Sequence, residues 1–428
     1  MRILSVHNSH NASICEIRDN KIIYFQEAER LDGVKKSRNW LILLQKYTGS
    51  KIDKFIFVHS SSYPPTGKKY VEEVLLQYDI TYQEIEYKID HHFYHACAAF
   101  FNSGLKQSYV FVIDGAGCFD HFDHSTSEII SLYLFKKNKY KKIFKVYSSE
   151  KEYVNNKNYF INTLSLGYLY LLVKKILNVK EEGSVMALSC YGNNDLNNFK
   201  LFTKKFNHFT TIQQELLDLQ ILYSNKNKAA VSKLVQTKLE EIVINYVKNI
   251  IKNKKRNLCV SGGVFQNTVL NSKLLDLVPN LYVDPCADDS GISMGAALWD
   301  LNSKKFIKNK INTLFLGDNP NYQNLNIQRL HNVTYEQVAK LISEKNIVAI
   351  YQGKNEIGKR ALGNRSFLYD PRDKHAKEKI NLLKNREWFR PTAGTVLHEH
   401  AHEWFNLKSK DESEFMSYVF QVKKPNVP

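Results

Sequence analysis

Apolar segments that run directly into glycine or aspartate turns are the feature that most restricts the fold of this chain. Three such segments are YVFVIDGAG, NLCVSGGVFQN and LYVDPCADDSG, and a helical stretch separates the first from the second. Strands that end in such turns and alternate with helices predict an α/β fold with ligands bound at the strand ends. We therefore expect the functional site to be built from these turns.

The rest of the chain extends this pattern. Residues 1–30 predict strand, turn and strand, because ILSVH, SICEI and KIIYF are rich in β-branched and aromatic residues around Asp19-Asn20. Between Gln213 and Lys255, apolar residues at steps of three and four predict helix. The polar, Asn-rich residues 302–332 predict a linker before a second unit. No internal repeat is visible in the sequence.

Composition narrows the class of protein. A chain of 428 residues buries enough apolar surface to fold without disulfides or a structural metal. Its six cysteines are scattered without a C-x-x-C pair, which favours a reducing compartment and a cytoplasmic location. No apolar run reaches the length of about 18 residues that a membrane span requires, so we expect no membrane segment.

The charge balance is strongly basic. Lysine and arginine number 60 against 43 acidic residues, a formal net charge of +17, which suits an anionic partner such as a nucleotide, phosphate or nucleic acid. The surplus is spread along segments rich in Lys and Asn, such as KNKKRN. A general coding bias is therefore an alternative explanation.

A pair of histidines indicates a metal site. His91 and His95 in DHHFYHACAAFF are four residues apart, so on a helix both imidazoles face one side at metal-chelating distance. Taken alone, this spacing also occurs by chance in surface or core pairs. Asp289 in CADDSGISMGAA lies on a turn before a helix start and could complete a site of two histidines and one carboxylate.

Glycines after two of the strands indicate a phosphate site. VIDGAG and SGGVFQN allow backbone N–H groups to approach phosphate, although either could be only a tight turn. Two such turns resemble the paired phosphate loops of the actin-like ATPase architecture, and neither is a Walker A motif. The residues assigned to nucleotide binding are Asp114, Gly115, Gly117, Gly262, Gly263 and Asn267.

A segment dense in arginine and glycine lies between Lys354 and Arg390. Guanidinium groups offer paired donors to anionic oxygens, and the interleaved glycines let the backbone turn sharply. A solvated basic loop is the alternative. The candidate anion-binding residues are Lys354, Arg360, Arg365, Arg372, Arg386 and Arg390.

These motifs occur together in a recognisable order. They are NSHNAS, QEAER, DHHFYHACAAFF, VIDGAG, SLGYLY, EEGSVMALSCYG, SGGVFQN, CADDSGISMGAA, GKNEIGKRALGNRSFLYDPR and INLLKNREWFRPTAGTVL. The set resembles the NodU/CmcH (TobZ-type) O-carbamoyltransferase family, from Ile3 to about Leu397. The segment EIGKRALGNRS is highly specific for that family.

The resemblance implies a fold with two parts. Residues 1–318 would form an actin-like (ASKHA) duplicated α/β domain, similar to the enzymes that threonylcarbamoylate tRNA. Residues 319–428 would form a shortened YrdC-like α/β domain, because the family normally continues well beyond this point. We expect a homo-oligomer or a partner chain to complete that domain.

The resemblance also implies a reaction. In that family the YrdC-like domain makes carbamoyladenylate from ATP and carbamoyl phosphate, and the other domain transfers the carbamoyl group to an acceptor hydroxyl. His91, His95 and Asp289 would bind a divalent metal, Fe(II) being favoured. His10 in NSHNAS would deprotonate the acceptor, and Lys35 lies where the family keeps a basic residue.

The remaining assignments follow from the same resemblance. The strand-end glycine turns would hold ATP or carbamoyladenylate. Carbamoyl phosphate would bind to Lys354, Arg360, Arg365, Arg386 and Arg390. The favoured acceptor is a hydroxyl on a sugar or natural-product small molecule. The alternatives are a hydroxymethylated base in DNA, which the net charge favours, and a non-catalytic nucleotide-binding relic.

Overall fold

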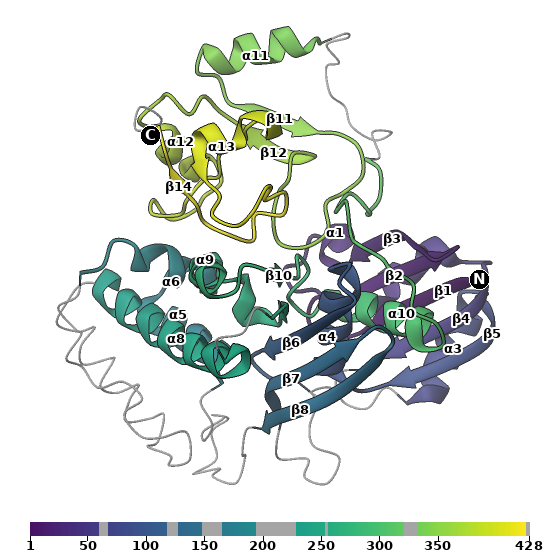
Figure 1. The fold of residues 1–428 in the computed structure, drawn as a ribbon. Helices are drawn as coiled ribbons and strands as arrows, with labels where there is room; N and C mark the ends of the chain where they lie inside the picture. Colours follow the sequence, from purple (N-terminus) through teal and green to yellow (C-terminus); the bar gives the residue numbers. More distant parts are fainter. Residues whose placement is uncertain are drawn as a thin grey trace.

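The structure is a computed structural model. It describes residues 1–59, 67–117, 127–147, 165–193, 228–252, 256–320 and 333–424. Two five-stranded mixed sheets follow one another along the chain, and a smaller C-terminal part lies against one end of them (Figure 1).

The first sheet has the strand order β3-β2-β1-β4-β5. Strand β1 pairs antiparallel with β2 and parallel with β4. The turn between β2 and β3 has positive φ at Asp19 and Asn20, so the predicted strand, turn and strand are confirmed. The strands are β1 (Arg2–His7), β2 (Ser13–Arg18), β3 (Lys21–Glu27), β4 (Lys51–Val58) and β5 (Thr81–Lys88).

The second sheet repeats this topology. Its order from the other edge is β8-β7-β6-β9-β10, and β6 pairs antiparallel with β7 and parallel with β9. The two sheets therefore have the same order and the same strand directions, so the α/β fold and its duplication are confirmed. The strands are β6 (Gln107–Ile113), β7 (Glu128–Lys136), β8 (Lys139–Tyr147), β9 (Leu258–Ser261) and β10 (Leu281–Val283).

Two buried helices lie between the sheets and pack against each other. Helix α4 (His91–Asn102) contacts β6, β7 and β9, whereas α10 (Gly291–Ser303) contacts β1, β2 and β4 (Figure 1). Their backbones meet at Gly295, where a Cβ atom would lie 1.9 Å from the carbonyl oxygen of Tyr94. Only glycine permits this approach.

Other helices cover the outer faces of the sheets. Apolar side chains of α5, α8 and α9 pack with those of the second sheet in one hydrophobic core. The helix predicted between Gln213 and Lys255 is confirmed over Lys228–Ile251, and the part before residue 228 lies outside the described residues. The helices are α1 (Glu29–Asp32), α2 (Trp40–Leu44), η1 (Gln45–Tyr47), α3 (Lys68–Gln77), α5 (Leu166–Leu177), α6 (Glu182–Ser189), α8 (Lys228–Ile251), η2 (Gly263–Gln266) and α9 (Thr268–Leu277). No helix within the described ranges combines the length and apolarity needed to cross a bilayer.

The predicted linker at 302–332 is partly wrong. Asn302 and Ser303 end α10, and the side chains of Ile311, Leu314 and Leu316 are buried in the core beside the first sheet. The prediction was wrong here because these few apolar residues are scattered through a stretch rich in Asn and Lys, whose composition is polar overall. Residues 321–332 lie outside the described part of the chain.

The C-terminal part contains short elements and little buried apolar surface of its own. Its two small sheets each contain two strands, β11 with β12 and β13 with β14. Its identity as a YrdC-like domain stays a prediction. The elements are α11 (Tyr335–Ser343), β11 (Val348–Tyr351), β12 (Arg365–Leu368), α12 (Ala376–Leu383), η3 (His398–His400), α13 (Ala401–Trp404), β13 (Phe405–Asn406) and β14 (Gln421–Val422).

The contact between α4 and α10 gives a stability prediction. Gly295→Ala places a methyl group into the Tyr94 carbonyl, so we expect the free energy of unfolding to fall by about 1–3 kcal/mol, measured by urea denaturation. The matched control is Gly183→Ala in α6, where a Cβ has no neighbour within 4 Å. That control should stabilise the protein by up to about 1 kcal/mol. Equal stability of the two variants would contradict this packing.

Candidate active site

Helix α4 brings two imidazoles together at its N-terminus. The Asp90 side chain caps the helix by accepting a hydrogen bond from the backbone N–H of Phe93. His91 and His95 are buried, and their Nε2 atoms lie 3.2 Å apart. The prediction that these two histidines share one face of a helix is therefore confirmed.

Two carboxylates face this imidazole pair. Asp114 follows β6, and its Oδ2 lies 3.2 Å from Nε2 of His91 and 3.6 Å from Nε2 of His95. Asp289 precedes α10, and its Oδ1 lies 3.5 Å and 3.7 Å from the same two atoms. Ligand atoms from all four residues lie within 4.8 Å of one another. The sequence placed Asp289 here, but it assigned Asp114 only to nucleotide binding.

The strand-end glycines fix the orientation of Asp114. Its Oδ1 accepts hydrogen bonds from the backbone N–H groups of Gly115 and Gly263, at 2.7 and 3.1 Å, which leaves Oδ2 toward the imidazoles. Gly262 has φ +96°, and a Cβ there would lie 2.3 Å from the Ile113 carbonyl oxygen. The two turns are thus packed against each other, and both N–H groups predicted for phosphate bind Asp114 in this structure.

The other two residues assigned to nucleotide also make internal contacts. A Cβ at Gly117 would lie 2.8 Å from the ring of His92, so this glycine allows close packing. Asn267 caps α9 by accepting a hydrogen bond from Leu270 N–H, and it is also bonded to Gln236. Their role in nucleotide binding stays a prediction.

Asp289 connects the imidazole pair to a third histidine. Its Oδ2 lies 2.8 Å from Nδ1 of His10, and it accepts a hydrogen bond from the Ser9 hydroxyl at 3.3 Å. The His10 side chain is 43% exposed, so it reaches from the buried cluster to solvent. One carboxylate oxygen thus faces the His pair and the other faces His10.

Mutual attraction keeps these groups charged despite their burial. Burial lowers the pKa of His91, but the carboxylates of Asp289 and Asp114 outweigh it and hold that pKa well above its ordinary value. Burial likewise raises the pKa of Asp289, but His10 and His91 together hold it well below its usual range. Asp289 also raises the pKa of His10. A divalent cation that binds these ligand atoms would therefore compete with protons for them.

An outer layer of polar groups supports His95. Its Nδ1 lies 3.4 Å from the Ser261 hydroxyl, which donates to Oδ2 of Asp284 at 3.0 Å. Burial raises the pKa of Asp284 to about 6. Such contacts to the second ring nitrogen are typical of metal-binding histidines, whose orientation they fix. Nothing in the sequence pointed to Ser261 or Asp284 beyond their positions at the ends of two strands, Ser261 as the last residue of β9 and Asp284 directly after β10.

Three of the predicted basic residues gather near α6. Arg390 binds Glu181 and Ser184, Arg360 donates to the carbonyl oxygen of Gln266, and Arg386 donates to the Asn381 side chain. Burial, and after it the like charge of Arg390, lowers the pKa of both Arg360 and Arg386.

Lys35 belongs to this region as well. Its ammonium group lies 2.5 Å from Glu181, and its side chain is 82% exposed. The structure thus places Lys35 beside the carboxylate that binds Arg390, and it records no contact of Lys35 with the histidine cluster among the described residues.

The remaining basic residues lie apart from this group. The Arg365 guanidinium donates to the carbonyl oxygens of Gln352, Gly353 and Asn364 and stacks over Tyr351, so it fixes the backbone before β12. Lys354 is exposed, and Arg372 pairs with Asp370. The structure therefore divides the predicted anion-binding set into two groups.

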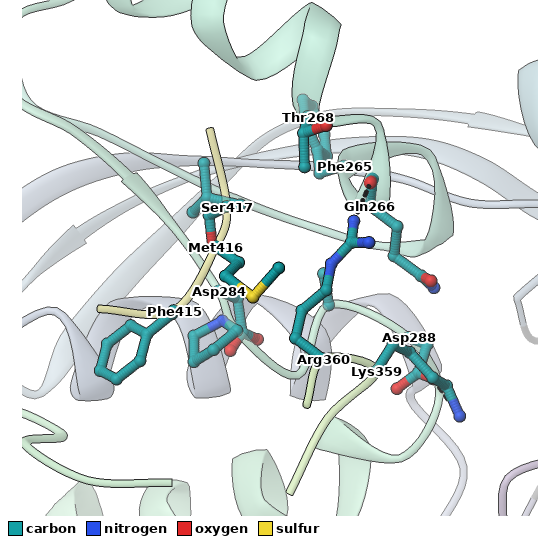
Figure 2. A pocket seen from close by; sticks show the side chains of 13 residues that line it. Phe265, Gln266, Thr268, Asp284, Asp288, Lys359, Arg360, Phe415, Met416 and Ser417 are labelled. Carbon is teal, nitrogen blue, oxygen red and sulfur yellow. Dashed lines mark hydrogen bonds and ion pairs between the residues drawn. The ribbon is translucent and has the colours of Figure 1, made fainter. Parts of the chain in front are cut away.

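A small hollow lies where the C-terminal part meets the strand ends of the second sheet. Figure 2 shows Arg360 pointing toward Gln266, with Lys359 and Asp288 beside it. Its other walls come from Phe265, Gln266 and Thr268, from the end of β10 and the turn after it, and from residues 415–417. Lys359 forms ion pairs with Asp288, Glu27 and Glu29, and it was not singled out in the sequence.

Sequence comparisons agree with this architecture. The family model described as carbamoyltransferase N-terminus matches residues 45–298, and the one described as carbamoyltransferase C-terminus matches residues 339–427. The chain is 31% identical over 376 residues to an uncharacterized protein of Methanocaldococcus jannaschii, covering 78% of this chain and 59% of that protein. It is 28% identical over 478 residues to the nodulation protein NolNO of Sinorhizobium fredii, covering 97% of this chain and 66% of that protein.

Solved structures show weaker likeness. A full-length HypF in the phosphate- and nucleotide-bound form is 13% identical with a TM-score of 0.43, covering 70% of this chain and 46% of that one. The chain spans 59% and 66% of the two relatives named above. The match to the N-terminal family model covers more than half of the chain, so this protein belongs to the carbamoyltransferase family.

Proposed function

We propose that this protein is an O-carbamoyltransferase that uses ATP and carbamoyl phosphate, by way of carbamoyladenylate, to carbamoylate an acceptor hydroxyl. The observation that supports this best is the buried cluster of His91, His95, Asp114 and Asp289, with His10 on the outer oxygen of Asp289. We propose an actin-like identity for the duplicated domain and a YrdC-like identity for the C-terminal part. The matching topologies of the two five-stranded sheets support the first identity, and membership of a family that has N- and C-terminal models supports the division into these two parts.

The donor set fits a divalent metal ion. Two imidazole nitrogens and two carboxylate oxygens converge in a buried site, a combination that suits first-row metals such as Fe(II) or Zn(II). When bound, such an ion would polarise the carbamoyl carbonyl or the nucleotide phosphate and so favour attack. Residues His91, His95, Asp114 and Asp289 would hold it.

His10 is the candidate general base. Its Nδ1 lies 2.8 Å from Asp289, which leaves Nε2 to accept the proton of the acceptor hydroxyl. The carboxylate would stabilise the resulting imidazolium, as in other histidine and aspartate pairs. The acceptor oxygen would then form a bond to the carbamoyl carbon, the bond from that carbon to the phosphate oxygen would break, and AMP would leave.

Strand-end turns and basic side chains are the proposed binding sites for the two anionic substrates, ATP and carbamoyl phosphate. ATP or carbamoyladenylate would lie against the turns at Asp114–Gly117 and Gly262–Asn267, with its phosphates toward the His cluster. Arg360, Arg386 and Arg390 form the more compact of the two basic groups, and we propose them for carbamoyl phosphate. Lys35 shares Glu181 with Arg390, and we propose that it acts beside this group.

The acceptor is proposed to be a hydroxyl on a small molecule such as a sugar. Family membership supports a hydroxyl-directed transfer, and the exposed side of His10 gives an acceptor access to the base. Hydroxymethylated DNA remains an outcome of the experiment below. The intact set of His10, His91, His95 and Asp289 argues against a non-catalytic relic.

The metal proposal predicts the effect of removing one imidazole. His91→Ala should reduce the bound divalent metal to near zero, measured by elemental analysis of protein that has been loaded with Co²⁺ and desalted. His375→Ala, which changes an exposed histidine far along the chain, should retain the metal content of the unaltered protein. Equal metal content in all three proteins would reject this site.

The charges of the cluster predict a pH dependence. Because the carboxylates raise the pKa of His91 in the metal-free protein, a proton must leave when metal binds. Affinity for Co²⁺ should therefore increase as the pH rises between about 6 and 8. Titration calorimetry in two buffers of different ionisation enthalpy measures the released protons, and identical heats in the two buffers would contradict the proposal.

The reaction itself can be tested with two separated readouts. The protein is incubated with ATP, carbamoyl phosphate and panels of sugars or hydroxymethylcytosine DNA, and pyrophosphate and carbamoylated product are measured. His10→Ala should lower product formation by about 10²–10⁴-fold, the usual worth of a general base, while pyrophosphate release continues. Loss of both activities together would count against His10 as the base, and product on DNA alone would replace the proposed acceptor.

A further inference from the structure

We propose that Lys359 is a positioning residue that holds the Asp289 turn in place from the C-terminal part of the chain. The inference rests on the proposed metal centre and assigns it a support outside the duplicated domain. Lys359 contacts neither the imidazoles nor the two facing carboxylates in the described structure. It acts through Asp288, the residue immediately before Asp289.

Lys359 joins two buried carboxylates from different segments. Its ammonium group lies 2.9 Å from Oδ2 of Asp288 and 3.1 Å from Oε2 of Glu27, with Glu29 at 3.8 Å. The Glu27 side chain is 1% exposed and that of Asp288 is 8% exposed. Two buried carboxylates that share one cation repel each other when the cation is removed. Lys359 therefore fixes the distance between the end of β3 and the turn before α10.

The backbone around Lys359 is docked closely on both sides. Gly358 donates its N–H to Oε1 of Glu27, and Arg30 donates to the Gly358 carbonyl oxygen, both at 3.1 Å. Gly358 has φ +80°, and a Cβ there would lie 2.7 Å from the carbonyl oxygen of Pro285. This segment consequently contacts the first sheet and the turn after β10 at the same time.

Lys359 affects the position of Asp289 through its ion pair with Asp288. Oδ1 of Asp288 accepts hydrogen bonds from the hydroxyl and the N–H of Ser290, while Oδ2 faces Lys359. Asp289 lies between these two residues in the chain, so its carboxylate direction follows the conformation of the turn. Loss of the Lys359 charge should displace Oδ1 of Asp289 from its position 3.5 Å from His91.

The next residue reaches the other turn of the centre. Arg360 donates to the carbonyl oxygen of Gln266, at the end of the η2 turn that begins with Gly263 (Figure 2). Gly263 in turn holds Asp114. Residues 358–360 thus touch both turns that orient the carboxylates, which would link the C-terminal part to the transfer site.

Metal affinity separates this role from a general contribution to stability. Folded wild-type protein, Lys359→Met and Lys359→Arg are titrated with Co²⁺, and the visible absorption of the bound ion reports both affinity and ligand geometry. We expect Lys359→Met to weaken binding about 10–100-fold and to change the spectrum, the usual effect of losing an outer-shell contact. Lys359→Arg should restore most of the affinity, because it keeps the charge.

The control is Lys46→Met, which removes a different ion pair, the one that joins η1 to Asp318 at 2.5 Å. Its Co²⁺ affinity and spectrum should equal those of the wild type. Asp288→Asn removes the carboxylate that pairs with Lys359 but keeps an oxygen that can accept the hydrogen bonds of Ser290. If Lys359→Met does not fold, the Co²⁺ affinity of Asp288→Asn tests the positioning role in its place. Unchanged affinity in the Lys359 and Asp288 variants would overturn the inference, whereas a wild type that binds no Co²⁺ would overturn the metal centre itself.

Discussion

The close packing of α4 against α10 determines where the chemistry of this protein can occur. Helix α4 carries the two imidazoles in its first two turns, and Asp289 lies just before α10, so the site exists only while the two helices meet at Gly295. Each helix lies on a different sheet. The centre therefore forms at the junction of the two halves, where a movement of one half against the other would alter its geometry.

The buried carboxylates of the His91, His95, Asp114 and Asp289 cluster need opposite charges or hydrogen bonds to offset the cost of their burial. Two carboxylates and two imidazoles are removed from water within 4.8 Å of one another, and isolated buried charges of this kind are strongly destabilising. Here every carboxylate faces an imidazole, and Asp114 also accepts two backbone N–H bonds. A divalent cation bound between neutral imidazoles would balance the two negative charges.

The sequence predicted local features well and long-range ones poorly. The first three strands, the histidine helix and the strand-end turns were predicted because each depends on the periodicity or turn chemistry of a few neighbouring residues. The second carboxylate, Asp114, was assigned to phosphate instead, since nothing in VIDGAG says that β6 ends beside α4. The duplication left no sequence repeat, because many residue combinations satisfy the same buried positions. In the sequence, nothing distinguishes Lys359 from the basic residues near it, because its partners Glu27 and Asp288 are distant in the chain and only the fold brings them together.

The central claim is that His91, His95, Asp114 and Asp289 hold a divalent metal ion. Anomalous diffraction from a crystal grown with Co²⁺, recorded on both sides of the cobalt absorption edge, locates such an ion directly. The account predicts one strong anomalous peak about 2.0–2.2 Å from imidazole nitrogens of His91 and His95 and from carboxylate oxygens of this cluster. A well-occupied peak elsewhere, or an ordered cluster with no peak, would contradict it.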